Sequence, residues 1–233
     1  MLTLYQFATS PFTEKVRRAL NYKSLPFDVH EVERGRVAEG AYQHVSATGK
    51  FPALVVDDEA VWDSTDILYR LEAIDSGPSL IPDDPREAGI AHAIEEWADE
   101  SLYFYEMTMR LSWAHNLESA LDEFSRSLPA VPKPQLKEMI LKSVGQLTQA
   151  QGVGRKPREQ VVADVERHLA RLNDLLHDRI WLAGDALSIA DLAVISQLNA
   201  LLYAEEARLA LNSLGAADRV TPWMRRIDQL APK

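Results

Sequence analysis

The chain has 233 residues, a formal net charge of −10 and no cysteine. Without cysteine, disulfides, thiolate metal sites and cysteine nucleophiles are excluded. The acidic balance disfavours nucleic acid as a partner because it repels phosphate groups, and the short basic runs at residues 15–18 and 155–158 are interpreted as solvated surface. No apolar stretch is long enough to span a membrane and the N-terminus has no signal-peptide pattern, so we expect a cytoplasmic protein without a membrane partner.

The first third of the chain alternates between strand-like and helix-like segments. The helix signal is clearest after residue 10, where Pro11 takes a first-turn position and Val16, Ala19 and Leu20 recur at helical spacing. Residues 36–48 are ambiguous between a weak helix and a loop. Strands are predicted over residues 2–7, 27–32, 53–57 and 59–62, the last two as a tight hairpin, and helices over residues 11–23 and 64–75. The predicted order is β-α-β followed by β-β-α.

A proline-rich stretch separates this part from the rest of the chain. Prolines at positions 78, 82 and 85 prevent a continuous helix there. Later segments show apolar residues at helical spacing, with a rigid break at residues 128–134. Residues 188–203 are apolar around most of the circumference, which predicts a buried helix. We therefore predict an α/β domain over residues 1–77, a linker over residues 78–86 and an all-helical bundle domain over residues 87–233.

Three local patterns in the first domain point to a ligand. Ser10 stands at the N-cap of the first predicted helix, whose free N–H groups and partial positive charge suit an anion, including a thiolate. Pro52 directly precedes a strand, where a cis bond would leave Phe51 free to pair with an extended peptide. Asp63 can accept from an ammonium, and Ser64 opens a helix that can hold a carboxylate. Taken singly, each pattern is also explained as a helix cap or a loop proline.

In this order and spacing, the three patterns resemble the N-terminal domain of the glutathione transferase family, which has a thioredoxin-like fold and precedes an all-helical domain. The resemblance implies that glutathione is the cosubstrate and that Ser10 stabilises its thiolate. The residues that it assigns to glutathione binding are Lys50, Phe51, Pro52, Asp63 and Ser64. Lys50 is the candidate partner of the glycyl carboxylate, although a solvated lysine explains it equally well.

The helical half carries a fourth pattern. Ser188 and Asp191 form a Ser-x-x-Asp capping box at the start of the predicted buried helix. With residues 181–185 before it, this box resembles the hallmark of the family's helical domain, and we assign it to folding. Residues 112–158 form a longer middle segment than the family usually has, and residues 151–155 look similar to a stretch in metaxin-like members.

The resemblance implies that the thiolate attacks a small hydrophobic electrophile or a peroxide. Ser10 is the best thiolate donor by alignment, Thr13 remains open as an alternative, and Thr9 and Tyr5 are lesser candidates. Because a serine cannot form the mixed disulfide of cysteine-bearing relatives, we expect no glutaredoxin-like reductase activity.

The electrophile is expected against the long helix that follows the linker. Several residues of this helix could face the cleft, namely Tyr103, Phe104, Tyr105, Met107, Met109, Arg110 and Trp113. Of these, the candidate pocket residues are Tyr105, Met109 and Trp113. No cluster of His, Asp and Glu stands at ligand spacing, so no metal is predicted, and the resemblance implies a homodimer. The alternative is a non-catalytic glutathione-binding, ligand-carrying or interaction protein of the same fold.

Overall fold

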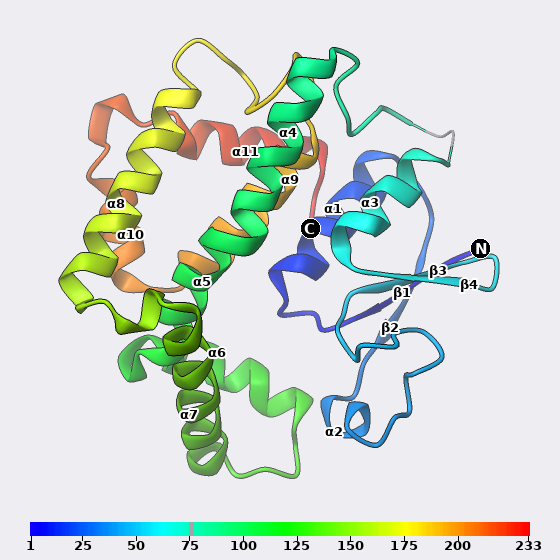
Figure 1. Ribbon diagram of the computed structural model, residues 1–233, viewed down its shortest axis with the longest axis vertical. Helices are drawn as coiled ribbons and strands as arrows, with labels where there is room; N and C mark the ends of the chain where they lie inside the picture. The colour runs from blue at the N-terminus through cyan, green and yellow to red at the C-terminus, as the bar shows by residue number, and fades with distance from the viewer. Residues whose placement is uncertain (75–76) are drawn as a thin grey trace.

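The computed structural model describes residues 1–74 and 77–233. It has two halves, a small sheet with helices and a larger helical part, which lie side by side (Figure 1). The first half contains β1 (Leu2–Gln6), α1 (Pro11–Tyr22), β2 (Asp28–Glu31), α2 (Arg34–Val37), β3 (Ala53–Val56), β4 (Glu59–Trp62) and α3 (Ser64–Glu72). The predicted β-α-β and β-β-α order is confirmed, and the short α2 overlaps the start of the ambiguous segment of residues 36–48.

The four strands form one mixed sheet in the order β2-β1-β3-β4. β1 runs parallel to β2, with Leu4 opposite Val29, and antiparallel to β3, with Leu4 opposite Leu54. β3 and β4 form the predicted hairpin. At its turn, Asp57 and Asp58 have φ values of 48° and 76°, the left-handed conformation that a two-residue hairpin loop requires and that aspartate tolerates.

Alternation along the strands divides the side chains between the two faces of the sheet. Leu4 and Leu54 join the apolar core with residues of α1 and α3. Tyr5 and Ala53 belong instead to a separate cluster with Phe51. α1 thus lies between the sheet and the helical half, where it packs against α9, and the segment after α2 covers the other face of the sheet (Figure 1).

The helical half begins earlier than predicted. α4 starts at Pro85, inside the predicted linker, because proline is tolerated in a first helical turn and Asp84 accepts hydrogen bonds from the N–H groups of Arg86 and Glu87, each at 3.0 Å. α3 ends at Glu72, and the predicted end of that helix at residue 75 lies outside the described residues.

The second half is helical almost throughout, and none of the described helices is both long and apolar enough to cross a membrane. Two π-helical segments, η1 (Ala98–Leu102) and η2 (Met107–Ser112), interrupt the long helix predicted after the linker. The other elements are α4 (Pro85–Trp97), α5 (Tyr103–Glu106), α6 (Ala114–Ser127), α7 (Lys133–Gln151), η3 (Val153–Arg155), α8 (Arg158–Leu175), α9 (Ile189–Leu201), α10 (Glu205–Asn212), η4 (Gly215–Ala217) and α11 (Val220–Leu230).

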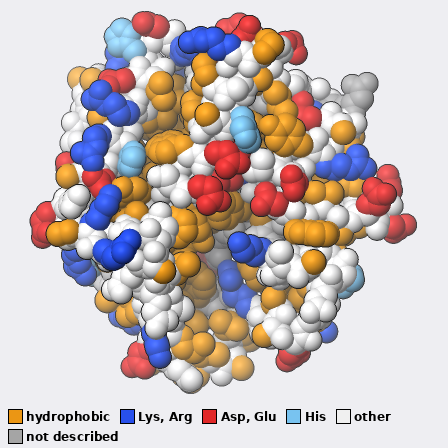
Figure 2. Space-filling view, viewed as in Figure 1, with side chains coloured by type: hydrophobic (Ala, Val, Ile, Leu, Met, Phe, Trp, Pro, Cys, Tyr) orange, Lys and Arg blue, Asp and Glu red, His pale blue; other side chains and the backbone are white. Residues whose placement is uncertain are grey.

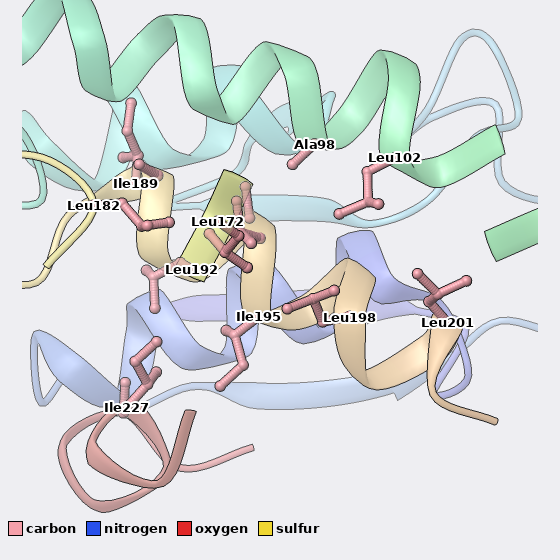
Figure 3. Close-up of a cluster of buried hydrophobic side chains, with 14 of the residues drawn as sticks. Ala98, Leu102, Leu172, Leu182, Ile189, Leu192, Ile195, Leu198, Leu201 and Ile227 are labelled. Atoms are coloured by element: carbon pink, nitrogen blue, oxygen red, sulfur yellow. The ribbon is translucent and has the colours of Figure 1, made fainter. Parts of the chain in front are cut away.

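α9 is the buried helix that the sequence predicts. Its side chains pack against α1, α4 and α11 from several directions (Figure 3). At its start, the fully buried carboxylate of Asp191 accepts hydrogen bonds from the Ser188 and Leu182 N–H groups, each at 3.0 Å, and from Trp223 Nε1 at 2.8 Å. One carboxylate therefore joins the α9 N-terminus, the preceding loop and α11.

The interpretation of residues 15–18 as a solvated surface is wrong for two of its three cations. Lys15 and Arg18 are completely buried. Arg18 donates to Glu14 at 2.9 Å, to Asp228 at 2.7 Å and to the Ala231 carbonyl at 2.6 Å. A buried cation is stabilised by carboxylates. Here these carboxylates belong to helices more than 70 residues away in the sequence or, for Glu14, to the same helix. The local sequence therefore could not reveal that Lys15 and Arg18 are buried.

Candidate functional site

A cavity of about 930 Å³ lies between the two halves. Its walls come from the β1–α1 junction, α2, the residues before β3, the start of α3, the α4–η2 run, α6 and α7. In the space-filling view the molecule is hollowed here, with acidic side chains along one rim and basic side chains inside (Figure 2). Three of the sequence patterns and the long middle segment meet at this cavity.

Ser10 lines the cavity at the N-cap of α1. Its side chain makes no capping hydrogen bond to the helix, so the hydroxyl is available to a ligand. Thr13, the alternative, is completely buried outside the cavity lining, and its Oγ1 has no hydrogen-bond partner among the described residues. Thr9 lines the cavity, whereas Tyr5 packs 4.5 Å from the ring of His30 on the other face of the sheet.

Phe51 and Pro52 also line the cavity, and the peptide bond between them is cis, as predicted. Within the described part of the chain, neither the N–H nor the C=O of Phe51 forms a hydrogen bond. The ring of Phe51 is buried against Phe7 at 5.4 Å, which holds the backbone in place. Lys50 beside it is exposed and lines the same wall.

Asp63 and Ser64 form the third part of the wall. Asp63 is the N-cap of α3, with φ of 88°, and its Oδ1 accepts a hydrogen bond from the Thr65 N–H at 2.9 Å. Ser64 is the first residue of the helix and is largely buried. The carboxylate therefore stands beside a helix N-terminus, which allows an ammonium and a carboxylate to bind next to each other.

The three residues predicted for the electrophile pocket lie outside the cavity lining. Tyr105 is buried and donates to Asp164 Oδ2 at 3.0 Å, which ties α5 to α8. Met109 is fully buried in the helical core, and Trp113 packs under the guanidinium of Arg158 at 5.0 Å. These three residues therefore do not form the pocket wall.

The cavity is lined instead by Tyr103, Met107 and Leu111, at the same spacing of four on the opposite side of the helix. Sequence periodicity failed here because both sides are apolar and because each π-helical turn adds a residue, which rotates the following side chains by about 100°. The facing wall comes from Phe124 of α6 and Val144 of α7. The middle segment of residues 112–158 thus builds one end of the cavity.

Two arginines also line the cavity, the buried Arg110 and the half-buried Arg34. The sequence indicated Arg110 as one of the residues of its helix that could face the cleft, but it did not indicate Arg34. Arg110 lines the cavity and is paired with Glu106 at 3.1 Å and Glu123 at 3.6 Å. Arg34 opens α2 and lines the cavity, and no carboxylate of residues 1–74 and 77–233 forms an ion pair with it. The one available signal for Arg34 was its position just after a predicted strand, and this does not distinguish it from a surface residue.

A buried charge network closes the cavity between α1 and α4. Lys15 Nζ donates to Glu95 Oε1 at 2.6 Å and to Asp99 Oδ2 at 2.5 Å, and Thr65 Oγ1 donates to Glu95 Oε1 at 2.6 Å. Burial alone would lower the pKa of Lys15, but the two carboxylates raise it overall. Burial, together with Glu95, raises the pKa of Asp99 to about 6 despite the lysine.

Among the described residues, one group has the composition of a metal site, namely His92, Glu95 and Glu96, with ligand atoms within 4.8 Å of one another. Lys15 already donates to Glu95, and an ammonium in contact with a ligand carboxylate opposes a second cation. The absence of a resident metal remains a prediction.

The fold and cavity define a class of protein: an α/β domain joined to a helical domain, with a cavity between them. Two family models match the chain, "Glutathione S-transferase, N-terminal domain" over residues 4–79 and "Glutathione S-transferase, C-terminal domain" over residues 155–226. The chain belongs to the glutathione transferase superfamily. Residues 112–154 of the middle segment lie between the two matches.

Individual relatives are distant. The chain is 24% identical to FtsZ-localized protein A of Caulobacter vibrioides over 86% of this chain and 77% of that protein. It is 25% identical to a maleylacetoacetate isomerase of Pseudomonas aeruginosa over 99% and 91%. Among solved structures, a glutathione S-transferase from Rhodospirillum rubrum is similar with a TM-score of 0.68 and 20% identity, covering 98% of this chain and 88% of that one, which supports the fold.

Proposed function

We propose that this protein is a glutathione transferase-like enzyme in which Ser10 stabilises the glutathione thiolate for attack on small hydrophobic electrophiles or peroxides. One observation carries the proposal. Ser10 occupies the α1 N-cap with a hydroxyl that does not cap the helix, in the same cavity wall as Phe51 and Asp63. A hydroxyl donor and a positive helix end thus face one space.

The cavity wall suits an extended tripeptide with charged ends. The Asp63 carboxylate would receive the γ-glutamyl ammonium, and the Ser64 hydroxyl with the α3 N-terminus would receive the neighbouring carboxylate. The free N–H and C=O of Phe51 would pair with the cysteinyl backbone. Lys50 would meet the glycyl carboxylate. The acidic rim and the basic interior of the hollow support this orientation (Figure 2).

The chemistry requires a thiolate at neutral pH. A model cysteine thiol has a pKa of about 8.5, and lowering it by two units requires about 2.7 kcal/mol. One charge-assisted hydrogen bond from Ser10 contributes about 1.5–3 kcal/mol, and the α1 N-terminus adds about 0.3–1 kcal/mol. The two sources together are sufficient. Glutathione is the cosubstrate in this account, and the protein supplies no metal to the reaction.

The second substrate would occupy the end of the cavity formed by Tyr103, Leu111 and Phe124. Burial raises the pKa of Tyr103, so its hydroxyl stays protonated and can donate a hydrogen bond. Since this end depends in part on residues 112–154, which lie outside both family matches, we attribute acceptor choice to that segment.

A non-catalytic role is the second candidate, because the name of the Caulobacter relative describes a protein localised with FtsZ rather than an enzyme. Calorimetric titration with glutathione and an activity panel (an aryl halide, an isothiocyanate and a hydroperoxide) separate the two. We expect saturable binding with Kd at or below about 1 mM and turnover of at least one compound. Binding without turnover supports the second candidate, and no binding contradicts both.

We also propose that two copies pair, the first domain of one against the second domain of the other, as the family resemblance implies. Sedimentation equilibrium tests this. A mass of twice 26.2 kDa is expected, and a monomer at all concentrations contradicts it.

A further inference from the structure

The guanidinium of Arg34 lies between aromatic rings from both halves of the protein. Its Cζ is 3.8 Å from the ring centroid of Phe7, after β1, and 5.3 Å from that of Phe124 on α6. Two rings thus fix the position of the group on the cavity wall. Because guanidinium is planar, a stacked arginine keeps its in-plane N–H groups directed outward from the rings.

Arg34 is a half-buried cation with few hydrogen-bond partners. Its hydrogen bond to Thr9 Oγ1 is long, at 3.4 Å. In the described residues Arg34 Nε has no hydrogen-bond partner and no carboxylate forms an ion pair with the guanidinium. Burial lowers the pKa of Arg34, and the nearby charge of Glu123 offsets this only in part. Removal from water thus disfavours the charged form of a group that stays protonated.

The buried cations of the described residues have carboxylate partners. Lys15 contacts Glu95 and Asp99, and Arg110 contacts Glu106 within the same cavity. Compared with them, Arg34 lacks an anion. A cation held in place, desolvated and facing a cavity gains most from an anionic ligand that completes its hydrogen bonds.

The position of Arg34 indicates which substrate brings that anion. Phe124, which contacts the guanidinium, belongs to the same wall as Leu111 and Val144, the apolar end that we assign to the second substrate. An acceptor seated there would place its apolar body against these side chains and a polar substituent near Arg34. A carboxylate matches the fork of the guanidinium with two parallel hydrogen bonds.

We propose that the preferred acceptors are apolar, ring-bearing electrophiles that carry a carboxylate, bound by Arg34. The proposal rests on the proposed function, since it names the second substrate of that same site. Arg34 is a binding residue in this account and takes no part in activating the thiol.

Two stable conjugates test the proposal: S-benzylglutathione and S-(4-carboxybenzyl)glutathione, which differ only in the carboxylate. Their dissociation constants are measured by calorimetry for the wild type, Arg34→Gln and Arg36→Gln. Arg36 lies on the same helix, is exposed and pairs with Glu33, so it is the matched control. We expect the carboxylated conjugate to bind about 10-fold more tightly to the wild type and to Arg36→Gln, with this ratio falling to about 1 in Arg34→Gln.

The outcomes distinguish the two proposals. If S-benzylglutathione binds the wild type but the carboxylate adds nothing, the inference fails alone. If neither conjugate nor glutathione binds, the proposed function fails and the inference with it. Arg34→Gln could instead weaken the binding of glutathione itself by about 10-fold, while the ratio between the two conjugates' dissociation constants persists. In that case Arg34 belongs to the glutathione subsite and the inference is overturned. The wild-type comparison needs no variant, so it remains decisive even if Arg34→Gln does not fold.

Discussion

The Lys15 ammonium on α1 lies 2.6 Å from Glu95 Oε1 on α4, where both side chains are shielded from water. This pair joins the two halves of the protein directly behind the cavity, and Asp99 at 2.5 Å from the same ammonium completes it. A charge network in this position holds the cavity walls together, because removing one member leaves the others buried without compensation.

Replacing Lys15 with methionine removes the cation and keeps most of the side-chain volume. We expect the free energy of unfolding to fall by about 3–5 kcal/mol, since Glu95 and Asp99 remain buried side by side. Denaturant unfolding measures the loss. Lys142→Met on the exposed face of α7 is the control and should change stability by less than about 0.5 kcal/mol. Equal effects of the two substitutions would contradict a structural role for the network.

Stability should also depend on pH through Asp99. Its pKa is about 6 in the folded protein against a reference of 3.8, so the folded state binds a proton that the unfolded state has released. This contribution to stability is complete below about pH 3.8 and is lost as pH rises through about 6. Relative to Asp99→Asn, the wild type should therefore lose stability between these values and change little above pH 7. A difference between the two that is constant over this range would refute the assignment.

Asp63→Asn separates charge from structure at the α3 N-terminus. Asparagine retains an oxygen that can cap Thr65 and tolerates the positive φ of this position, but it cannot pair with an ammonium. Glutathione should bind about 10-fold more weakly, with the melting temperature nearly unchanged. Asp66→Asn, on the same cavity wall, is the comparison variant. If both substitutions weaken binding equally, general electrostatic attraction explains the result and Asp63 has no specific role.

Asp191 should be indispensable for stability rather than for chemistry. Asp191→Ala leaves the N–H groups of Leu182 and Ser188 and the indole of Trp223 without an acceptor in the core. We expect a loss of about 3 kcal/mol or more. Asp178→Ala at an exposed site should be neutral. Thermal unfolding of both variants measures the difference. Similar melting temperatures would contradict the claim that Asp191 holds the start of α9 in place.

The sequence allowed the fold to be predicted, and the residues proposed for glutathione do meet on one cavity wall, because both features depend on local chemistry. Each of the patterns that led to these predictions is local, because its residues lie within a few positions of each other in the sequence. This holds for the serine and proline at the start of α1, for Asp63 and Ser64, and for the capping box that begins at Ser188. The opposite wall depends on which side of an apolar helix meets α6 and α7, and on two π-helical turns that no local pattern marks. Lys15 and Arg34 were missed for the same reason, since their surroundings come from distant parts of the chain.

The pKa of the bound glutathione thiol tests the central claim most directly. Ultraviolet titration of the thiolate in the binary complex should give a value about two units below the 8.5 of a model cysteine for the wild type. Ser10→Ala should raise it by one unit or more. Thr13→Val, which removes a buried hydroxyl without a hydrogen-bond partner in the described residues, should leave it unchanged. The assignment of Ser10 as the group that stabilises the thiolate would be contradicted by either of two results. The glutathione thiol could keep its wild-type pKa in Ser10→Ala, or its pKa could rise in Thr13→Val.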